Sequence, residues 1–283
     1  MGKSTLIVRK MERRELDTVI NWAASEGWNP GINDAEVFYS ADPGGFFIAL
    51  NGDGEAVGAI SAVAYDDNFG FIGLYIVKPE YRGHRVGIEL GNAAMNYLGN
   101  RNIGLDGVEK KLANYQSHGF KTAYNNIRYE GVACASETVA ELADILNVPF
   151  EKLLEYDRRF FPACREKFLH SWIRQKGAAG LALYEKKTLN GYGVIRPCRN
   201  GYKAGPLFAN TYELADNILT SLTAHIPEGT DFYLDIPGVN QDALRLVEKY
   251  GMKPVFKTAR MYSREKPELQ LKGIFGITSF ELG

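Results

Sequence analysis

The sequence predicts an α/β protein with a mixed (α+β) sheet, built from two similar domains in tandem. The chain has 283 residues, more than one domain usually holds and enough for two buried cores. Short apolar segments alternate with amphipathic helical segments in both halves. Features around Asp106 and Gly119 return around Asp235 and Gly251, at offsets of 129 and 132 residues. This steady offset favours a duplicated fold over chance similarity.

Hydrophobic periodicity and turn residues define the elements of the first domain, residues 1–133. Leu16, Val19 and Ile20 recur at helical spacing, and Asn51-Gly-Asp-Gly54 is typical of a hairpin turn between antiparallel strands. The predicted elements are, in chain order, a strand at 7–8, helices at 13–24 and 33–39, strands at 46–50, 56–64 and 71–77, a helix at 88–98, a strand at 103–105, a helix at about 108–118 and a strand at 122–129.

A change of pattern after Gly131 predicts a helical connector over 134–176, followed by the second domain over 177–283. Helices are expected at 137–146, 150–156 and 163–173, with Ser136 as a plausible cap. In the second domain, Gly191-Tyr-Gly-Val-Ile195 repeats the pattern of 56–60, and Leu214, Ile218 and Leu222 recur at helical spacing.

The segment after the strand at 71–77 is typical of a phosphate site. Pro79 ends the strand, and a turn that carries Arg82, Gly83, Arg85 and Gly87 leads directly into a helix. The first N–H groups of a helix have no partner within the helix and attract phosphate, and arginine adds charge-assisted bonds. The sequence therefore predicts a pyrophosphate site over 81–87.

This motif resembles the acyl-CoA loop of the GNAT acetyltransferases, Gln/Arg-x-x-Gly-x-Gly/Ala after a strand. Arg82 stands at the first motif position and Gly87 at the last. Arg85 replaces a family glycine, so it must either hold the same backbone geometry or turn its guanidinium toward the ligand. The resemblance implies acetyl-CoA as cosubstrate and no metal. It assigns acetyl-CoA binding to Tyr75, Ile76, Val77, Arg82, Gly83, His84, Arg85, Val86, Gly87 and Asn114.

The second domain lacks this loop. Phe208-Ala-Asn-Thr-Tyr-Glu213 leads into its helix without an arginine or glycine at the mouth, so a single acetyl-CoA site is expected. A competent first domain followed by a degenerate second one resembles a tandem GNAT subgroup typified by the YitH/HolE-like proteins. Residues 26–31, 42–47 and 126–129 also look like that subgroup.

Acetyl transfer to an amine needs a stabilised oxyanion and a proton for the departing thiolate. Tyr115 lies four residues before Gly119-Phe120, where similar GNAT enzymes place a general-acid tyrosine, and the matching position in the second domain is Val247. The oxyanion is expected to meet a backbone N–H at Ile76 or Val77, where the strand must separate from its neighbour.

The acceptor side is less visible in the sequence. Trp28 and Asn29, in the loop that ends the first helix, are predicted to line the acceptor pocket. A primary amine is almost wholly protonated at pH 7, which is a handicap of about 4–5 kcal/mol that a base must offset. The sequence leaves that base open among Asp66, Asp67 and Asp235.

Composition limits the partners. Lys+Arg number 33 and Asp+Glu 34, so no basic excess favours a nucleic acid. Three scattered cysteines favour neither disulfides nor zinc, and no apolar run is long enough for a membrane span, so a cytoplasmic protein is expected. The leading hypothesis is an N-acetyltransferase for a small amine. A non-catalytic acyl-CoA sensor or scaffold, and an aminoacyl transferase that uses charged tRNA, are alternatives.

Overall fold

The computed structural model describes residues 6–134 and 141–283, which share one mixed 13-stranded sheet. The strand order is β1-β2-β3-β4-β5-β12-β6-β11-β10-β9-β8-β7, and β13 pairs with β10 off this path. The strands are β1 Ile7–Lys10, β2 Phe46–Leu50, β3 Ala56–Ala64, β4 Phe69–Val77, β5 Asn102–Val108, β6 Lys121–Val132, β7 Ala143–Asp144, β8 Ala179–Glu185, β9 Thr188–Pro197, β10 Tyr202–Ala209, β11 Asp231–Pro237, β12 Lys253–Tyr262 and β13 Ile274–Gly276.

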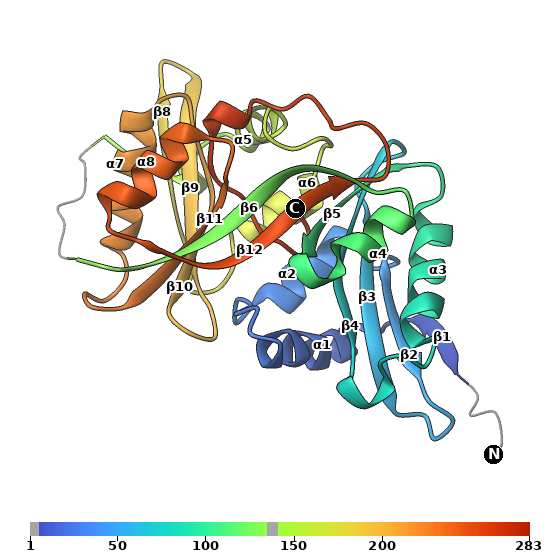
Figure 1. Cartoon of the computed structure of the whole chain (residues 1–283). Helices are drawn as coiled ribbons and strands as arrows, with labels where there is room; N and C mark the ends of the chain where they lie inside the picture. The colour runs from blue at the N-terminus through green and yellow to red at the C-terminus, as the bar shows by residue number, and fades with distance from the viewer. Residues whose placement is uncertain (1–5, 135–140) are drawn as a thin grey trace.

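Helices cover both halves of this sheet (Figure 1). The α-helices are α1 Arg13–Ser25, α2 Asp34–Ala41, α3 Val86–Leu98, α4 Leu112–Ser117, α5 Phe150–Asp157, α6 Glu166–Trp172, α7 Tyr212–Thr223 and α8 Gln241–Lys249. Short 3₁₀ turns lie at Pro79–Tyr81, Glu109–Lys111, Ile145–Asn147 and Leu271–Gly273. The predicted α/β fold with a mixed sheet and the element order of the first half are confirmed. One element differs in detail, because the predicted helix at 108–118 divides into a 3₁₀ turn and α4.

The two halves exchange strands at the middle of the sheet. β12 pairs with β5 on one side and with β6 on the other, antiparallel to both. β6 in turn pairs with β11 from Asn126↔Pro237 to Val132↔Asp231. β6 and β12 therefore run as long neighbouring strands between the halves (Figure 1). The sheet continues from one half into the other through β12 and β6, and the domain division expected at 133 and 176 stays a prediction.

The connector contains less helix than expected. Helices α5 and α6 agree with the predicted segments at 150–156 and 163–173, but the predicted helix at 137–146 is wrong where the structure describes it. Ala143 and Asp144 pair with β8, and the Asp144 carboxylate accepts the Leu146 N–H at 2.8 Å. A side chain that bonds its own backbone two residues on favours a turn over a helix. Ser136 lies outside the described residues.

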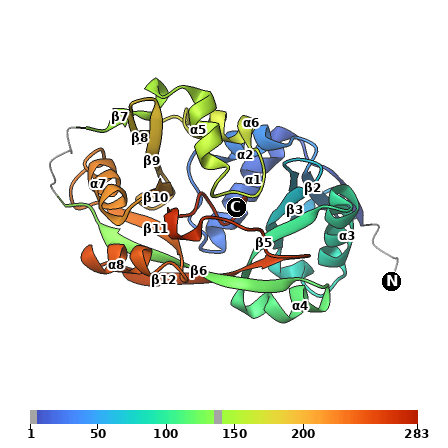
Figure 2. The same ribbon diagram turned by 90° about the horizontal axis from the view of Figure 1, so that it is seen from above.

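A shared core joins the halves around the C-terminal tail, which we define as residues 274–283. Every residue of this tail is buried, and the C-terminus lies near the middle of the molecule in two perpendicular views (Figures 1 and 2). The core around it combines apolar side chains from α1, α2, β4, α5, α6 and the tail, among them Leu16, Phe38, Leu74, Leu153, Trp172 and Phe280. Helices α3 and α7 pack on separate cores.

A buried ion pair fixes the halves to each other. Arg128 of β6 donates to both carboxylate oxygens of Asp235 on β11, at 2.6 and 2.7 Å. Its remaining nitrogen donates to the main-chain oxygen of Trp28 at 2.7 Å, and its guanidinium lies 4.8 Å from the Phe280 ring centroid. One side chain thereby holds β11, the loop after α1 and the C-terminal tail.

Replacing Arg128 with alanine is expected to lower the free energy of unfolding by about 3–5 kcal/mol, because Asp235 would remain charged and buried without a partner. Urea unfolding followed by circular dichroism measures this loss. Arg245→Ala removes an exposed ion pair with Asp242 and serves as the control, with an expected loss below about 1 kcal/mol. Equal losses in the two variants would contradict the assigned role of Arg128.

Candidate active site

The site begins with a bulge in β4. Leu74 has a φ of 44°, and the register between β3 and β4 shifts at this point. β4 pairs in parallel with β5 only as far as Ile72↔Leu105, although the two strands continue to Val77 and Val108. An extra residue in one strand bends that strand and ends regular pairing. The two strands therefore separate beyond Ile72, as the sequence predicted.

The register shows which main-chain groups of β4 face the gap. Lys78 N–H donates to the Val57 carbonyl at 3.0 Å, and Val77 stands opposite Gly58. Because bonded and non-bonded pairs alternate in antiparallel strands, the N–H and C=O of Val77 point away from β3. The N–H of Ile76, which stands opposite Ala59, then points toward β3. Of the two amides predicted for the oxyanion, only that of Val77 faces the gap.

The loop between β4 and α3 presents a row of main-chain donors. Gly83 has a φ of 85° and Arg85 a φ of 64°, so the chain turns twice through left-handed conformations before α3 begins. No side chain caps the helix at Arg85. Within the described residues, five main-chain N–H groups of this loop and the first helical turn have no acceptor in the protein. They belong to Gly83, Arg85, Val86, Gly87 and Ile88. This arrangement suits the oxygens of a diphosphate.

The two loop arginines have different surroundings. Arg82 donates to the Val77 carbonyl through Nε at 2.9 Å and forms an ion pair with Glu26 at the end of α1. Arg85 adopts the left-handed geometry that the family's glycine favours, and its side chain is 76% exposed beside Glu89. The Arg85 backbone therefore holds the geometry expected of the family's glycine, which was the first of the two alternatives. The exposed guanidinium of Arg85 remains able to contact an anion.

Tyr75 supports the loop from below. Its hydroxyl donates to the Gly87 carbonyl at 2.5 Å, and a Cβ placed on Gly87 would lie 2.9 Å from the Tyr75 hydroxyl oxygen. Glycine at 87 thus lets α3 begin close to β4. Burial raises the pKa of Tyr75, so it stays a hydrogen-bond donor at neutral pH.

Tyr115 lies on α4, on the same side of the sheet as α3. Its ring packs edge-on to Phe120, and a Cβ on Gly107 of β5 would lie 3.1 Å from the ring. Burial, with a smaller effect from Tyr75, raises the pKa of Tyr115 to about 12. The phenol is therefore protonated throughout the neutral range, as a general acid requires. The sequence predicted Tyr115 in the helix at about 108–118, and the structure adds its proximity to Tyr75.

Other predicted residues of the loop and of α4 lie at the surface. Asn114 and His84 are exposed, and the Asn114 carbonyl bonds Nδ1 of His118 at 2.7 Å. His118 thus caps the end of α4. A cavity of about 270 Å³ lies beside the loop and is lined in part by Tyr81, His84 and Val86.

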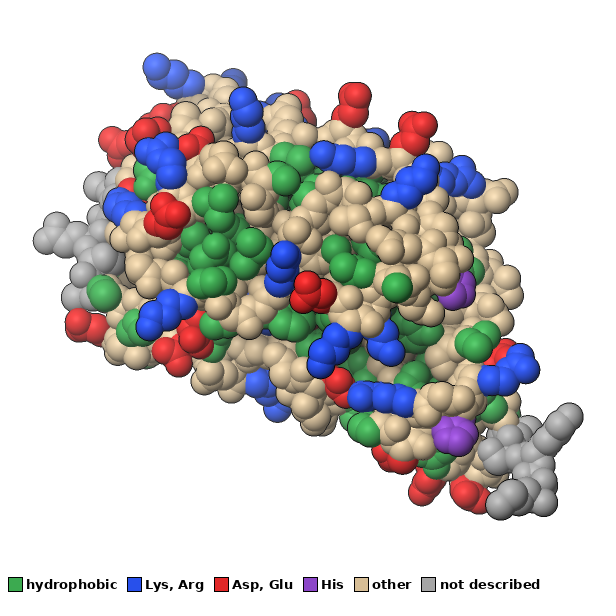
Figure 3. All heavy atoms as spheres, in the orientation of Figure 1, with side chains coloured by type: hydrophobic (Ala, Val, Ile, Leu, Met, Phe, Trp, Pro, Cys, Tyr) green, Lys and Arg blue, Asp and Glu red, His purple; other side chains and the backbone are tan. Residues whose placement is uncertain are grey.

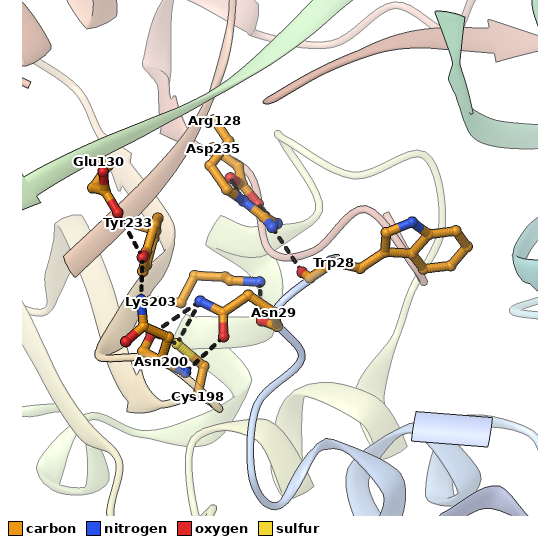
Figure 4. A network of polar contacts seen from close by, with 9 residues as sticks. All are labelled: Trp28, Asn29, Arg128, Glu130, Cys198, Asn200, Lys203, Tyr233 and Asp235. Carbon is orange, nitrogen blue, oxygen red and sulfur yellow. Dashed lines mark hydrogen bonds and ion pairs between the residues drawn. The ribbon is translucent and has the colours of Figure 1, made fainter. Parts of the chain in front are cut away.

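The side chains of Trp28 and Asn29 point in different directions (Figure 4). The side chain of Asn29 points into the second half, where it donates to the Asn200 carbonyl at 2.9 Å and accepts the Asn200 N–H at 2.8 Å. Lys203 donates to its main-chain oxygen at 2.8 Å. The Trp28 indole points away from this cluster and packs on the shared core. The acceptor role of both residues stays a prediction, and the Asn29 amide already has partners.

None of the three acids considered as a base is free. Oδ1 of Asp66 accepts the N–H groups of Asn68 and Phe69 at 2.8 Å, which is an ordinary turn cap. Asp67 is fully exposed and pairs with Arg101 at 3.7 Å. Asp235 is paired with Arg128, and although burial opposes ionisation, the pair lowers the pKa of Asp235.

The second half also contains two parallel strands that separate, but another strand occupies the gap between them. β10 pairs in parallel with β11 only from Tyr202↔Phe232 to Ala204↔Leu234. Beyond that point β13 of the C-terminal tail pairs with β10 at Leu207↔Gly276 and Phe208↔Ile274.

At the start of α7, Thr211 Oγ1 accepts the Leu214 N–H at 3.2 Å, where the first half leaves its amides free. A cavity of about 500 Å³ beside this helix start is lined by Arg159, Asn210 and the segment 269–273. Arg159 bonds Asn210 and Gln270.

Charge is mixed on the face shown in Figure 3, where Lys and Arg side chains lie among Asp and Glu side chains. No helix in the described parts of the chain is long and apolar enough to cross a bilayer. Across residues 6–134 and 141–283, no group of three His, Cys, Asp or Glu side chains is placed to hold a metal ion.

A separated parallel strand pair that leads into an uncapped helix fits the acyl-CoA site that the resemblance to the GNAT family implies. Two family models agree with it: the acetyltransferase (GNAT) family matches residues 13–120, and an acetyltransferase (GNAT) domain matches 153–276. The chain belongs to the GNAT acetyltransferases, with two GNAT domains in tandem, and is an acyltransferase.

Relatives match along almost the whole chain. The holothin acyltransferase of Pseudoalteromonas sp. is 29% identical over 272 residues, covering 95% of this chain and 92% of that protein. The uncharacterized N-acetyltransferase YitH of Bacillus subtilis is 23% identical over 278 residues, covering 97% of each. The tandem GNAT resemblance is confirmed.

Solved structures share the fold. A putative acetyltransferase from Pyrococcus horikoshii has a TM-score of 0.85 at 23% identity and covers 100% of this chain and 98% of its own. A tandem GNAT protein from the clavulanic acid biosynthesis pathway has a TM-score of 0.66 at 12% identity, with coverage of 93% and 100%.

Arg82→Ala is expected to weaken acetyl-CoA binding about 10- to 100-fold, because a charge-assisted contact is worth about 1.5–3 kcal/mol and the loop loses its bond to Val77. Calorimetry with acetyl-CoA measures the change. The control is Arg14→Ala, which removes an exposed arginine on α1. Unchanged affinity in Arg82→Ala would show that the loop does not hold the diphosphate.

Proposed function

We propose that the protein moves the acetyl group of acetyl-CoA to a primary amine of a small acceptor. The observation that carries this proposal is the set of five unpartnered amides, those of Gly83 and of Arg85 to Ile88, directly after the separation of β4 from β5. In this proposal the diphosphate of acetyl-CoA binds these amides, with Arg82 and Arg85 supplying positive charge. The pantetheine arm runs along Tyr75 to Val77 as an added strand. In this proposal, the exposed residues His84 and Asn114 contact the cosubstrate from the surface.

Tyr115 acts as the general acid. Tyr115 donates its proton to the sulfur while the C–S bond breaks, so that the sulfur need not leave as a free thiolate. The pKa of about 12 keeps Tyr115 protonated until then. The Val77 N–H, which faces the gap, stabilises the oxyanion of that centre.

The second half supports a single acetyl-CoA site and an acceptor between the halves. Its own divergence is filled by β13, and its helix start is capped by Thr211. The shared core places α1, α2 and the C-terminal tail on the side of β4 opposite α3. The acceptor would approach β4 from this side.

Two measurements test the proposal in sequence. Calorimetry measures acetyl-CoA binding, and thiol release from acetyl-CoA is then followed over a panel of amines. The panel contains amino sugars, polyamines, aromatic amines, peptides with free amino termini and holothin, for which the Pseudoalteromonas relative is named. Thiol release with an amine supports the transferase. Binding without release over the whole panel would favour an acyl-CoA sensor.

Tyr115→Phe is expected to lower kcat by about 10- to 10⁴-fold and to leave the affinity for acetyl-CoA unchanged, because it removes only the phenolic proton. Steady-state thiol release and calorimetry measure the two quantities. Tyr97→Phe, at a hydroxyl bonded to Asp42, is the matched control and is expected to keep kcat. Wild-type turnover in Tyr115→Phe would remove Tyr115 from the mechanism.

A further inference from the structure

One buried carboxylate differs from the others. Among the described residues, the buried acids Asp34, Asp157 and Asp235 each hold an arginine at 2.8, 2.7 and 2.6 Å. Glu281, in the C-terminal tail, is 4% exposed and has no hydrogen-bond or ion-pair partner among the described residues. Burying a carboxylate without a partner costs several kcal/mol, so such a residue is seldom kept for stability alone.

Glu281 lies beside the bulge of β4. Its main-chain oxygen packs on Gly73 so closely that a Cβ there would lie 1.9 Å away. The next residue of β4 is Leu74, where the strand turns away from β5. Only glycine at 73 lets the tail reach this point, so the contact is built into both segments.

The tail and Tyr115 lie on opposite faces of β4. Leu74 and Ile76 belong to the shared core, together with Phe280 and Leu282 of the tail. Tyr75 and Val77 point to the other face and pack in the α3 core with Tyr115. A reaction centre in the gap between β4 and β5 therefore has Tyr115 on one side and, on the other, the tail whose main chain meets Gly73 at Glu281.

The charged surroundings of Glu281 come from four elements. Arg128 on β6, Arg196 on β9 and Lys203 on β10 favour the ionised carboxylate, and Asp34 on α2 opposes it. Burial is the largest effect and raises the pKa of Glu281 above its ordinary value. Burial also lowers the pKa of Lys203 to about 8. A carboxylate with a raised pKa is a stronger base, and the nearby cations keep its ionised form accessible.

We propose that Glu281 is the general base that takes the proton from the acceptor amine, held at the bulge of β4 by the C-terminal tail. This role rests on the proposed acetyl transfer to an amine. As the N–C bond forms, one N–H bond breaks and its proton passes to a Glu281 oxygen. The C–S bond breaks with its electron pair on sulfur, which takes the proton of Tyr115. Solvent then returns the proton from Glu281 to the tyrosinate, so the net change is one proton moved from nitrogen to sulfur.

The test compares Glu281→Gln with Glu268→Gln, an exposed carboxylate earlier in the C-terminal region. The assay is thiol release with the panel amine that the wild-type protein acetylates fastest. Glu281→Gln is expected to lower kcat/KM by about 10²- to 10⁴-fold and to keep acetyl-CoA affinity, because glutamine has the same shape but accepts no proton. Glu268→Gln is expected to match the wild type.

The pH profile separates a base from a structural residue. Because only the ionised form acts as a base, wild-type kcat/KM should rise as the pH passes through the raised pKa of Glu281. Glu281→Gln should lose this acidic limb. Formate, a small carboxylate that fits the space left by the side chain, should restore part of the activity of Glu281→Ala.

Three results would overturn the role of Glu281. Thiol release by the wild type with undiminished release by Glu281→Gln overturns the role of Glu281 alone. No release by the wild type with any amine overturns the acetyl transfer and, with it, this role. Loss of acetyl-CoA binding in both Glu281→Gln and Glu281→Asp would show that the tail is only a wall of the site, which also overturns the proposal.

Discussion

The bulge at Leu74 is the constraint on which the active half depends. A leucine with positive φ costs about 1–3 kcal/mol, and the complete burial of its side chain in the shared core offsets that cost. Once β4 turns away from β5, the Val77 amide faces open space and α3 begins where the strand points. The same bend requires glycine at 73 and at 87, where Glu281 and Tyr75 approach the backbone. The phosphate loop, the strand gap and the tail contact are thus consequences of one local distortion.

The second half shares the strand separation of the first. Its parallel strands separate after the same short pairing, but the chain fills the opening with its own strand β13. A filled gap contributes main-chain hydrogen bonds to stability and leaves no room for a pantetheine arm. The exchange of β6 and β12 joins the two halves, since β12 lies between β5 and β6, and β6 lies between β12 and β11 in the shared sheet.

Local sequence was enough for the features that depend on neighbours in the chain. The strands and helices of the first half, the loop at Arg82 to Gly87 and the tyrosine before Gly119 follow from periodicity, turn residues and motif spacing. Features that depend on distant segments could not be predicted in this way. The insertion of β12, the pairing of 143–144 with β8 and the capture of the Asn29 amide by Asn200 are contacts between residues far apart in sequence. Glu281 carries no local signal either, because only the path of the tail brings it to Gly73.

The course of the tail also bears on how the duplication has diverged. Leu207 and Phe208 bond the tail in the degenerate half, and Gly73 receives it a few residues later in the competent half. To open the gap of the second half for a nucleotide cosubstrate, β13 would have to leave β10. Because β13 and the residue that packs on Gly73 belong to the same tail, this movement would also disturb the contact at Gly73 in the first half. With β13 in place, the structure leaves room for the proposed acetyl-CoA site in one half only.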